Sequence, residues 1–375
     1  MSKIGIITYH SAYNFGSALQ AYATQQAVNR ICGNSSIVNY RLSEQNYFYK
    51  TLYRRKYGYK VLIKDCLMLP VAKARRERAE KYEAFFRNYF AMTEEVSEPK
   101  QVQLLWEQYD VMISGSDQIF SKKSHELRGS DWKYMEPYLL SGFQGRRISY
   151  ASSLGGATEE DVHHIIPALK EFDALAFRES SSAKRIEELL QHPIDVVLDP
   201  TFLLSKEEWI EKLHLQKTTG EKYVLVYSLR NPQTVSKLIK PLSGFAKKRN
   251  CRVLMVTPFT YLPIMDSQFE NHPEYGPIDF LSALYNAEAV VTDSYHGTIL
   301  AVNFNKDVYS ISGNNLHEQR KADVLERLGL SDRVLHQAGA LEKASSHAID
   351  YSEVNKKISH MREHSLDYLK RNLCL

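Results

Sequence analysis

The segment Val290–Leu300, VVTDSYHGTIL, places an aspartate, a serine and a histidine between two apolar runs. A buried strand is expected to end at Val291, and Ser294 is a good N-cap for a following helix. His296 then lies in the first helical turn, whose positive end disfavours a protonated ring while the site is empty. A bound anion reverses that preference. His296 is therefore a candidate catalytic proton donor; the alternative is a histidine packed in a turn with its ring nitrogens satisfied.

Tyr295 and Gly297 flank this histidine in the same turn. Because Gly297 has no side chain, a ligand is expected to approach the backbone at that point. Ser294, Tyr295 and Gly297 are accordingly predicted to contact substrate.

A second candidate position follows the apolar run Val111–Ser114 in YDVMISGSDQIF. An aspartate at the end of a strand can position a hydroxyl or accept its proton. Asp117 is therefore predicted to be catalytic, and its neighbour Gln118 to bind substrate. The alternative is an aspartate that caps the next helix.

Arg178 closes a strand in LAFRESSSAKRIEEL, and Ser180 or Ser181 is expected to cap the next helix. An arginine at this position can present a bidentate fork to a carboxylate or a phosphate. We predict that Arg178 binds substrate; the alternative is a structural salt bridge with Glu179 or another neighbour.

Further candidate binding residues also follow expected strands. Asn14 and Gly16 lie in YHSAYNFGSALQAYATQ, before a helix expected from about Ser17. The glycine permits close backbone approach, and the free N–H groups of a helix start can hold an anion; the alternative is a tight turn without a ligand. Arg230 and Arg320 can each add positive charge to a cleft, or can have plain surface roles.

Short apolar runs alternate with helical patterns along the 375 residues. Most runs lack strict alternation, as expected for strands that are covered on both faces. The predicted fold is α/β, with two doubly wound parallel-sheet domains facing a cleft. Ligands of such sheets bind beyond the carboxyl ends of the strands, where all the candidate residues lie. The expected strands are Ile4–Thr8, Val111–Ser114, Ile148–Ala151, Ala174–Phe177, Val196–Leu198, Tyr223–Tyr227, Val253–Val256, Ala289–Val291 and Val308–Ile311.

Asp199-Pro200 is expected to end a strand, and the polar piece from Gln216 to Lys222 leads into the next one, so the domain boundary is expected in this region. We predict Rossmann-like domains at 1–205 and 218–346. The remaining residues, 347–375, are expected to form a terminal helix that can pack back on the first domain.

The basic segment Lys50–Arg87 contains twelve Lys or Arg and four Asp or Glu, in a chain whose net charge is +4. Tyrosines and phenylalanines interleave these cations; Tyr82, Phe85, Phe86 and Tyr89 have helical spacing. One interpretation is a solvated helix with one core face. The other is a surface for anionic lipid or an acidic polymer. No nucleic-acid partner is expected, because no known motif accompanies the charge.

Cysteine spacing and hydropathy limit the remaining classes. Cys32, Cys66, Cys251 and Cys374 form no C-x-x-C pair, so neither a zinc site nor a disulfide framework is expected. The first residues do not resemble a signal peptide, and no window approaches the roughly 18 apolar residues of a membrane span. A cytoplasmic protein is expected, with the basic segment as a candidate contact to the inner face of the membrane.

The motifs together resemble the polysaccharide pyruvyl transferase family. The match runs in order from about residue 3 to about residue 330, through YHSAYNFGSALQAYATQ, DVMISGSDQIF, FRESSSA, VLDPTFLL and VVTDSYHGTILAV. The resemblance implies a GT-B-like fold and transfer of a pyruvyl group from phosphoenolpyruvate to a sugar, forming a ketal. The implied acceptors are capsule, exopolysaccharide or cell-wall sugars, or their lipid-linked precursors.

The family pattern assigns Arg178 and His296 to contacts with phosphoenolpyruvate. Some members carry a second arginine two positions before the histidine, where this chain has Ser294. Either Arg230 or Arg320 supplies the missing charge, or this member handles its donor differently. Apart from the donor substrate, no cofactor and no metal is expected. Two alternatives remain open: a GT-B-type glycosyltransferase that uses a nucleotide sugar, and a non-catalytic polysaccharide-binding protein.

Overall fold

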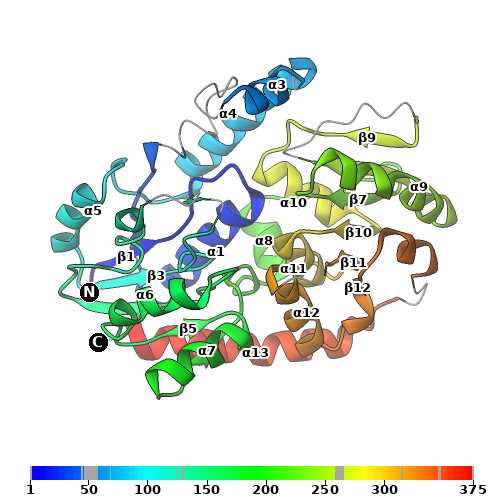
Figure 1. The fold of residues 1–375 in the computed structure, drawn as a ribbon. Helices are drawn as coiled ribbons and strands as arrows, with labels where there is room; N and C mark the ends of the chain where they lie inside the picture. The colour runs from blue at the N-terminus through cyan, green and yellow to red at the C-terminus, as the bar shows by residue number, and fades with distance from the viewer. Residues whose placement is uncertain are drawn as a thin grey trace.

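Two parallel sheets lie side by side, each with helices around it, in the computed structural model of the chain (Figure 1). The structure describes residues 2–43, 45, 58–67, 69–124, 126–127, 131–257, 266–313, 316–344 and 348–373. Residues 50–57 of the basic segment therefore lie outside the described residues.

The first sheet has the order β2-β1-β3-β4, with all neighbours parallel. Isolated parallel bridges, such as Ile148 to Ala174 and Ser152 to Phe177, connect this sheet to the pair β5-β6. The bounds are β1 Ile4–Ile7, β2 Ser35–Ile37, β3 Val111–Ser114, β4 Arg146–Ser149, β5 Ala176–Phe177 and β6 Asp195–Val196.

The second sheet has the order β12-β11-β10-β7-β8-β9, again with parallel neighbours throughout. Its central strands are buried along almost their whole length, which explains their continuous apolar runs. The bounds are β7 Tyr223–Tyr227, β8 Arg252–Val256, β9 Phe269–Asn271, β10 Ala289–Thr292, β11 Asp307–Ile311 and β12 Val334–Leu335.

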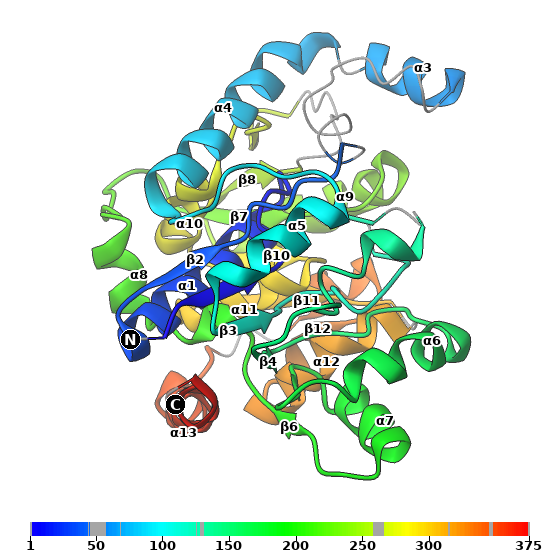
Figure 2. The same cartoon turned by 90° about the vertical axis from the view of Figure 1, so that its left-hand side faces the viewer.

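Helices connect the strands and cover the faces of both sheets (Figures 1 and 2). The α-helices are α1 Phe15–Cys32, α3 Tyr59–Leu67, α4 Ala72–Tyr89, α5 Pro99–Leu105, α6 Glu159–Leu169, α7 Ser180–Leu190, α8 Lys206–Lys212, α9 Pro232–Lys248, α10 Pro277–Asn286, α11 Tyr295–Asn303, α12 Leu316–Leu328 and α13 Tyr351–Leu373. Short 3-10 turns are η2 Leu69–Val71, η3 Trp106–Gln108, η4 Trp132–Tyr134, η5 Pro200–Phe202, η6 Ser331–Arg333 and η7 Ala338–Lys343.

The predicted α/β class with parallel sheets is confirmed, and each expected strand overlaps an observed one. Three strands of two or three residues, β2, β9 and β12, were not predicted because they carry no apolar run long enough to recognise. Two predicted helix starts are wrong. Helix α1 begins at Phe15 rather than near Ser17, and Glu179, rather than a serine, occupies the cap position before α7.

The part of the chain with strands β1–β6, here called the first half, packs tightly against the second half, which contains strands β7–β12. Phe15 of α1 stacks on Phe280 of α10, with ring centroids 4.4 Å apart and an interplanar angle of 7°. The Asn303 side chain on α11 donates to the carbonyls of Thr201 and Leu204, both at 2.9 Å. One hydrophobic core cluster includes residues of both halves. The strand ends of the two sheets are thus held in a fixed relation.

Helix α13, drawn in red, runs along both halves (Figure 1). Near its start, the Tyr351 hydroxyl donates to the carbonyl of Lys306 in the second half. Near its end, the Tyr368 hydroxyl donates to the carbonyl of Ser149 at 2.8 Å, and the Ser365 hydroxyl accepts from the Leu198 N–H at 2.9 Å. The last turns of the chain therefore pack on the first sheet.

Candidate active site

A cavity of about 260 Å³ lies between the two halves, beyond the carboxyl ends of strands from both sheets. Asn14 follows β1, Asp117 follows β3 and Arg178 follows β5. The second half contributes residues after β7 and β10 and from α12. The lining residues are Asn14, Asp117, Gln118, Arg178, Leu229, Arg230, Asp293, Ser294, Tyr295, His296, Arg320 and Lys321.

Arg178 is the centre of a buried ionic network. Its Nε pairs with Glu179 at 3.0 Å, its Nη1 with Asp199 at 2.8 Å and its Nη2 with Asp117 at 3.2 Å. The side chain is only 1% exposed. The salt bridge with Glu179, left open as the alternative by the sequence, is therefore present. All three guanidinium nitrogens of Arg178 pair with carboxylates of the protein. Direct contact between Arg178 and substrate stays a prediction.

Asp117 has a left-handed backbone conformation, with φ 77°, that turns its carboxylate toward Arg178. The carboxylate accepts from the Ser17 hydroxyl at 3.2 Å and from the Gln118 N–H at 2.9 Å. Burial raises the pKa of Asp117, but Arg178 and then His296 more than offset this effect, so the pKa lies below its usual value. A carboxylate that is this firmly ionised is a weak base.

Asp199 brings Arg178 and His296 together. Its Oδ2 lies 2.8 Å from Arg178 Nη1 and 3.4 Å from His296 Nε2, and its Oδ1 accepts from the N–H and the hydroxyl of Thr201. Burial raises the pKa of Asp199, but His296 and Arg178 outweigh burial and hold it well below its usual range. A permanent negative charge thus stands beside the imidazole ring.

Asp199 was not predicted as a site residue. The Asp199-Pro200 pair indicates the end of a strand, and the carboxylate satisfies the same rule, position directly after a strand, that selected the other residues. Its negative charge lies beside the His296 ring, for which the sequence predicted only the neighbouring positive helix end. The predicted N-cap is confirmed, since the Ser294 hydroxyl accepts from the Gly297 N–H at 3.3 Å.

The ring of Tyr295, in the second half, packs against the guanidinium group of Arg178. The guanidinium carbon of Arg178 lies 4.4 Å from the centre of its ring, and that of Arg320 lies 5.5 Å away. Arg320 is 8% exposed, and its Nη1 lies 3.9 Å from a Glu179 carboxylate oxygen. Burial and then Arg178 lower the pKa of Arg320, but an arginine keeps its charge in proteins. Two buried guanidinium groups therefore lie close together on one tyrosine ring.

Arg230 and Asp293 form a further part of the cavity wall. Arg230 Nε lies 3.5 Å from an Asp293 oxygen, which also accepts from the Ser228 hydroxyl. Burial raises the pKa of Asp293 above its usual value, although the Leu229 N–H and Ser228 act in the opposite direction. Lys321 donates to the carbonyls of Asp293 and Ile311, both at 2.7 Å, and so fixes this wall to the ends of β10 and β11.

Protein atoms fill the space where a side chain would lie at the two glycines that the sequence assigns to ligand approach. A Cβ at Gly297 would lie 2.5 Å from Thr292 Oγ1 and 2.8 Å from Tyr227 Cδ1, so this glycine lets α11 pack on the sheet. A Cβ at Gly16 would lie 2.1 Å from His296 Nδ1. The Gly16 N–H donates to the Asn14 side chain. Sheet side chains therefore lie beside Gly297 and the His296 ring lies beside Gly16, and ligand contact at these two glycines stays a prediction.

Within the described ranges, no group of three or more His, Cys, Asp or Glu side chains is arranged to hold a metal ion. Over the same part of the chain, no helix is long and apolar enough to cross a bilayer. The predictions about cofactors and cell compartment stay predictions.

The fold and the site define a class: a two-part parallel α/β protein of the GT-B-like type, with a charged cavity where the halves meet. Residues 14–315 match the sequence model of the family described as polysaccharide pyruvyl transferase. The chain belongs to this family, which supports its assignment as a transferase in polysaccharide biosynthesis. A comparison with curated protein sequences found no match.

Solved structures with a similar fold include enzymes of nucleotide-sugar metabolism. UDP-GlcNAc 2-epimerase from Neisseria meningitidis, bound to UDP-GlcNAc, has a TM-score of 0.55 at 10% identity and covers 99% of this chain and 100% of its own. The UDP-GlcNAc 2-epimerase from Methanocaldococcus jannaschii has a TM-score of 0.51 at 11% identity, with 96% and 92% covered. The complex of S. aureus MnaA with UDP has a TM-score of 0.50 at 11% identity, with 100% and 97% covered. At these identities the likeness shows the fold alone.

Proposed function

We propose that this protein transfers the pyruvyl group of phosphoenolpyruvate to two hydroxyls of one sugar, in a surface polysaccharide or its lipid-linked precursor. The observation that carries the proposal is the character of the cavity: it is small, and three arginines and a lysine line it together with His296. Such a lining suits a compact ligand with several negative charges. Phosphoenolpyruvate carries a carboxylate and a phosphate on a three-carbon frame.

The size of the cavity favours this proposal over nucleotide-sugar transfer. Its volume of about 260 Å³ is below the range of roughly 300–1,000 Å³ found for pockets of drug-sized ligands. A nucleotide sugar has several times as many atoms as phosphoenolpyruvate and needs apolar or stacking surface for its base. A purely glycan-binding protein, in turn, has no need of a buried Arg178–Asp199–His296 network.

The proposed reaction balances without an oxidant or a cofactor. A proton adds to the methylene carbon of phosphoenolpyruvate, the first sugar hydroxyl attacks the central carbon, and the second hydroxyl replaces the phosphate there. Two C–O bonds to the sugar form and the C–O bond to phosphate breaks. Of the two hydroxyl protons, one balances the proton on the new methyl group and the other leaves on hydrogen phosphate.

His296 is the proposed proton donor in this reaction. It lies in the first turn of α11, lines the cavity and has Asp199 beside its Nε2 at 3.4 Å. Asp199 has no place in the lining itself, so its proposed role is to position and charge-balance the ring. Proton transfer by a positioned side chain contributes roughly 10²–10⁴-fold to a rate.

The cations divide into two proposed roles. Arg320 and Arg230 bind the carboxylate and phosphate of the donor, because both line the cavity and come from different elements, α12 and the loop after β7. Arg178 holds Asp117, Glu179 and Asp199 in register and adds positive field below Tyr295. The donor lies between these groups, near the Ser294 cap and the amide side chains of Asn14 and Gln118.

Asp117 is proposed to orient the acceptor hydroxyl rather than to act as a strong base, because Arg178 and His296 hold its pKa low. Asp117→Asn should keep donor affinity and lower turnover by about tenfold, the value of one hydrogen bond. A loss near 10⁴-fold would instead identify the base.

Product analysis tests the proposed function. Purified protein, phosphoenolpyruvate and an oligosaccharide acceptor library should release phosphate and add the mass of a pyruvate ketal to one acceptor. UDP-sugars should give no transfer under the same conditions. Transfer of a sugar from UDP, or glycan binding with no response to phosphoenolpyruvate, would replace this proposal by one of its two rivals.

A further inference from the structure

Exposed apolar side chains gather at one projecting part of the first half. In the described part of the chain, the exposed large hydrophobic side chains are Tyr59 at 70%, Ile63 at 56%, Leu69 at 51% and Leu104 at 77%. The first three lie on α3 and η2, within eleven consecutive sequence positions. Clustered apolar exposure of this kind marks a contact surface more often than scattered single residues do.

The apolar pattern of α3 is inverted relative to a helix that faces water. Tyr59, Ile63 and Cys66, with spacing i, i+4 and i+7, are exposed on one face. Asp65 on the other side is buried, with 1% exposure. A surface helix of a globular protein normally turns its apolar stripe inward. The outward stripe therefore lacks cover within the described structure.

Exposed cations accompany this stripe. Lys60 lies beside Tyr59 on α3, and Lys73 and Arg76 lie on the first turns of α4. The whole segment Lys50–Arg87 has twelve basic and four acidic residues. A face that combines aromatic and aliphatic side chains with an excess of Lys and Arg matches the boundary between acyl chains and anionic headgroups.

Both views show α3 and the start of α4 standing away from the body of the protein (Figures 1 and 2). The other end of α4 is anchored. Tyr82 and Phe86 are buried, and Lys81 pairs with Asp279 of α10 at 3.0 Å. We call α3, η2 and the first turns of α4 up to Arg76 the basic arm.

We propose that the basic arm binds the surface of an anionic lipid bilayer, with Tyr59, Ile63 and Leu69 inserted and the cations against the headgroups. A second copy of the chain fits this face less well. In a two-fold contact the same patch meets itself, so Lys60, Lys73 and Arg76 of one copy would face those of the other. Anionic lipid complements both features of the patch at once.

The same helix connects the basic arm to the cavity. Tyr82 stacks on Phe15, with ring centroids 5.7 Å apart, and Phe15 directly follows Asn14 of the cavity lining. Tyr82 lies ten positions after Ala72, or roughly 15 Å along a helix that rises about 1.5 Å per residue. A bound arm would thus hold the cavity close to a lipid-linked acceptor. This last step rests on the proposed function, whereas the bilayer contact does not.

Vesicle sedimentation of the full chain tests the proposal. One set of vesicles contains phosphatidylcholine alone, and the other contains equal parts of phosphatidylcholine and phosphatidylglycerol. One variant carries Tyr59→Ser, Ile63→Ser and Leu69→Ser, and its control is Leu104→Ser on α5. A second variant carries Lys60→Gln, Lys73→Gln and Arg76→Gln, and its control carries Lys222→Gln, Lys356→Gln and Lys370→Gln, at exposed lysines outside the basic arm.

The expected result is binding to the anionic vesicles only, weakened about tenfold or more by the serine variant and about 100-fold by the glutamine variant. Both controls should bind like the original chain, and all proteins should keep the same melting temperature. Absence of binding to anionic vesicles overturns the proposal, as does equal binding by the controls and the arm variants. Dimerisation without lipid binding, abolished by the serine variant, would identify a self-association surface instead. Soluble transfer to a short acceptor should be unchanged in every variant, which keeps a failure here distinct from a failure of the proposed reaction.

Discussion

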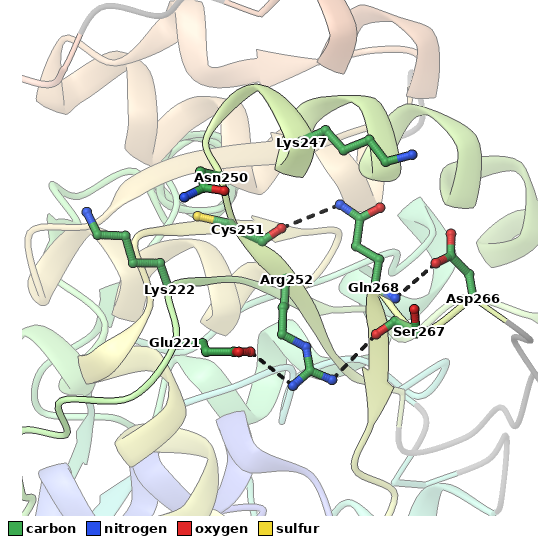
Figure 3. Close-up of a pocket in the computed structure, with 9 residues that line it drawn as sticks. All are labelled: Glu221, Lys222, Lys247, Asn250, Cys251, Arg252, Asp266, Ser267 and Gln268. Carbon is green, nitrogen blue, oxygen red and sulfur yellow. Dashed lines mark hydrogen bonds and ion pairs between the residues drawn. The ribbon is translucent and has the colours of Figure 1, made fainter.

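The two ends of the second sheet carry two different cavities. At the amino ends of β7, β8 and β9 lies a cavity of about 750 Å³, lined by Glu221, Lys222, Lys247, Asn250, Cys251, Arg252, Asp266, Ser267 and Gln268 (Figure 3). At the carboxyl ends, the cavity that contains His296 has about 260 Å³. Size alone would select the first cavity, whereas chemistry selects the second.

The arginines of the two cavities show the difference. Arg252 pairs with Glu221 at 3.2 Å, but the two side chains are 46% and 75% exposed (Figure 3). Arg178 is 1% exposed and meets three carboxylates. Moreover, the carboxyl-end cavity combines residues from both halves of the chain, whereas the lining residues of the amino-end cavity all come from the second half. Buried charge that converges from separate elements, rather than volume, distinguishes the candidate active site.

The largest expected contrast is between Arg178→Met and Arg252→Met. Removal of Arg178 leaves three buried carboxylates without their main partner, which should destabilise the protein by about 3–5 kcal/mol. Removal of Arg252 breaks an exposed pair worth about 0–1 kcal/mol. Chemical denaturation of the two variants measures both values. Equal losses of stability in the two variants would contradict the view that the buried network around Arg178 contributes more to stability than the exposed pair of Arg252.

The next contrast concerns rate. His296→Gln should lower turnover by about 10²-fold or more and shift the melting temperature by only a few degrees, because the ring acts on substrate more than on packing. Arg252→Gln at the other cavity should change neither quantity. A His296→Gln protein that is strongly destabilised but turns over normally once folded would show that the histidine is structural.

Glycine substitutions sharpen the comparison without removing any charge. Gly16→Ala places a methyl group 2.1 Å from the original position of His296 Nδ1, so the imidazole must move. Turnover should fall by about tenfold or more, since small displacements of catalytic groups are costly. Gly244→Ala on α9, where a Cβ meets nothing within 4 Å, is the matched control and should slightly stabilise its helix. Equal activities in these two variants would remove His296 from the mechanism.

The smallest expected effect is a pH dependence at Asp293. Because burial raises its folded-state pKa, Asp293 binds protons more tightly in the folded protein, so its contribution to stability falls as pH rises. Asp117 and Asp199, with lowered pKa values, behave oppositely and lose their contribution only in acid. The free energy of unfolding of the original protein minus that of Asp293→Asn should therefore decrease as the pH rises from about 4 to 7. Melting temperatures of the two proteins across that range follow this difference. An increase of the difference with pH would contradict a raised pKa for Asp293.

Much of this fold and site is predictable from the sequence, because apolar runs mark buried strands and ligands bind after such strands. That rule predicts Asp117, Arg178 and His296 at one cleft, and all three line the same cavity. It does not identify their partners. Asp199 joins Arg178 to His296 only through tertiary packing, and the His296 ring lies beside Gly16 for the same reason.

The central claim is that the smaller cavity binds phosphoenolpyruvate. Calorimetric titration of phosphoenolpyruvate into the original protein, Arg320→Gln and Arg252→Gln tests this claim most directly. We predict one binding site in the original protein, affinity about tenfold or more weaker in Arg320→Gln, and unchanged affinity in Arg252→Gln. No binding to the original protein, or equal affinity in all three, would contradict the claim.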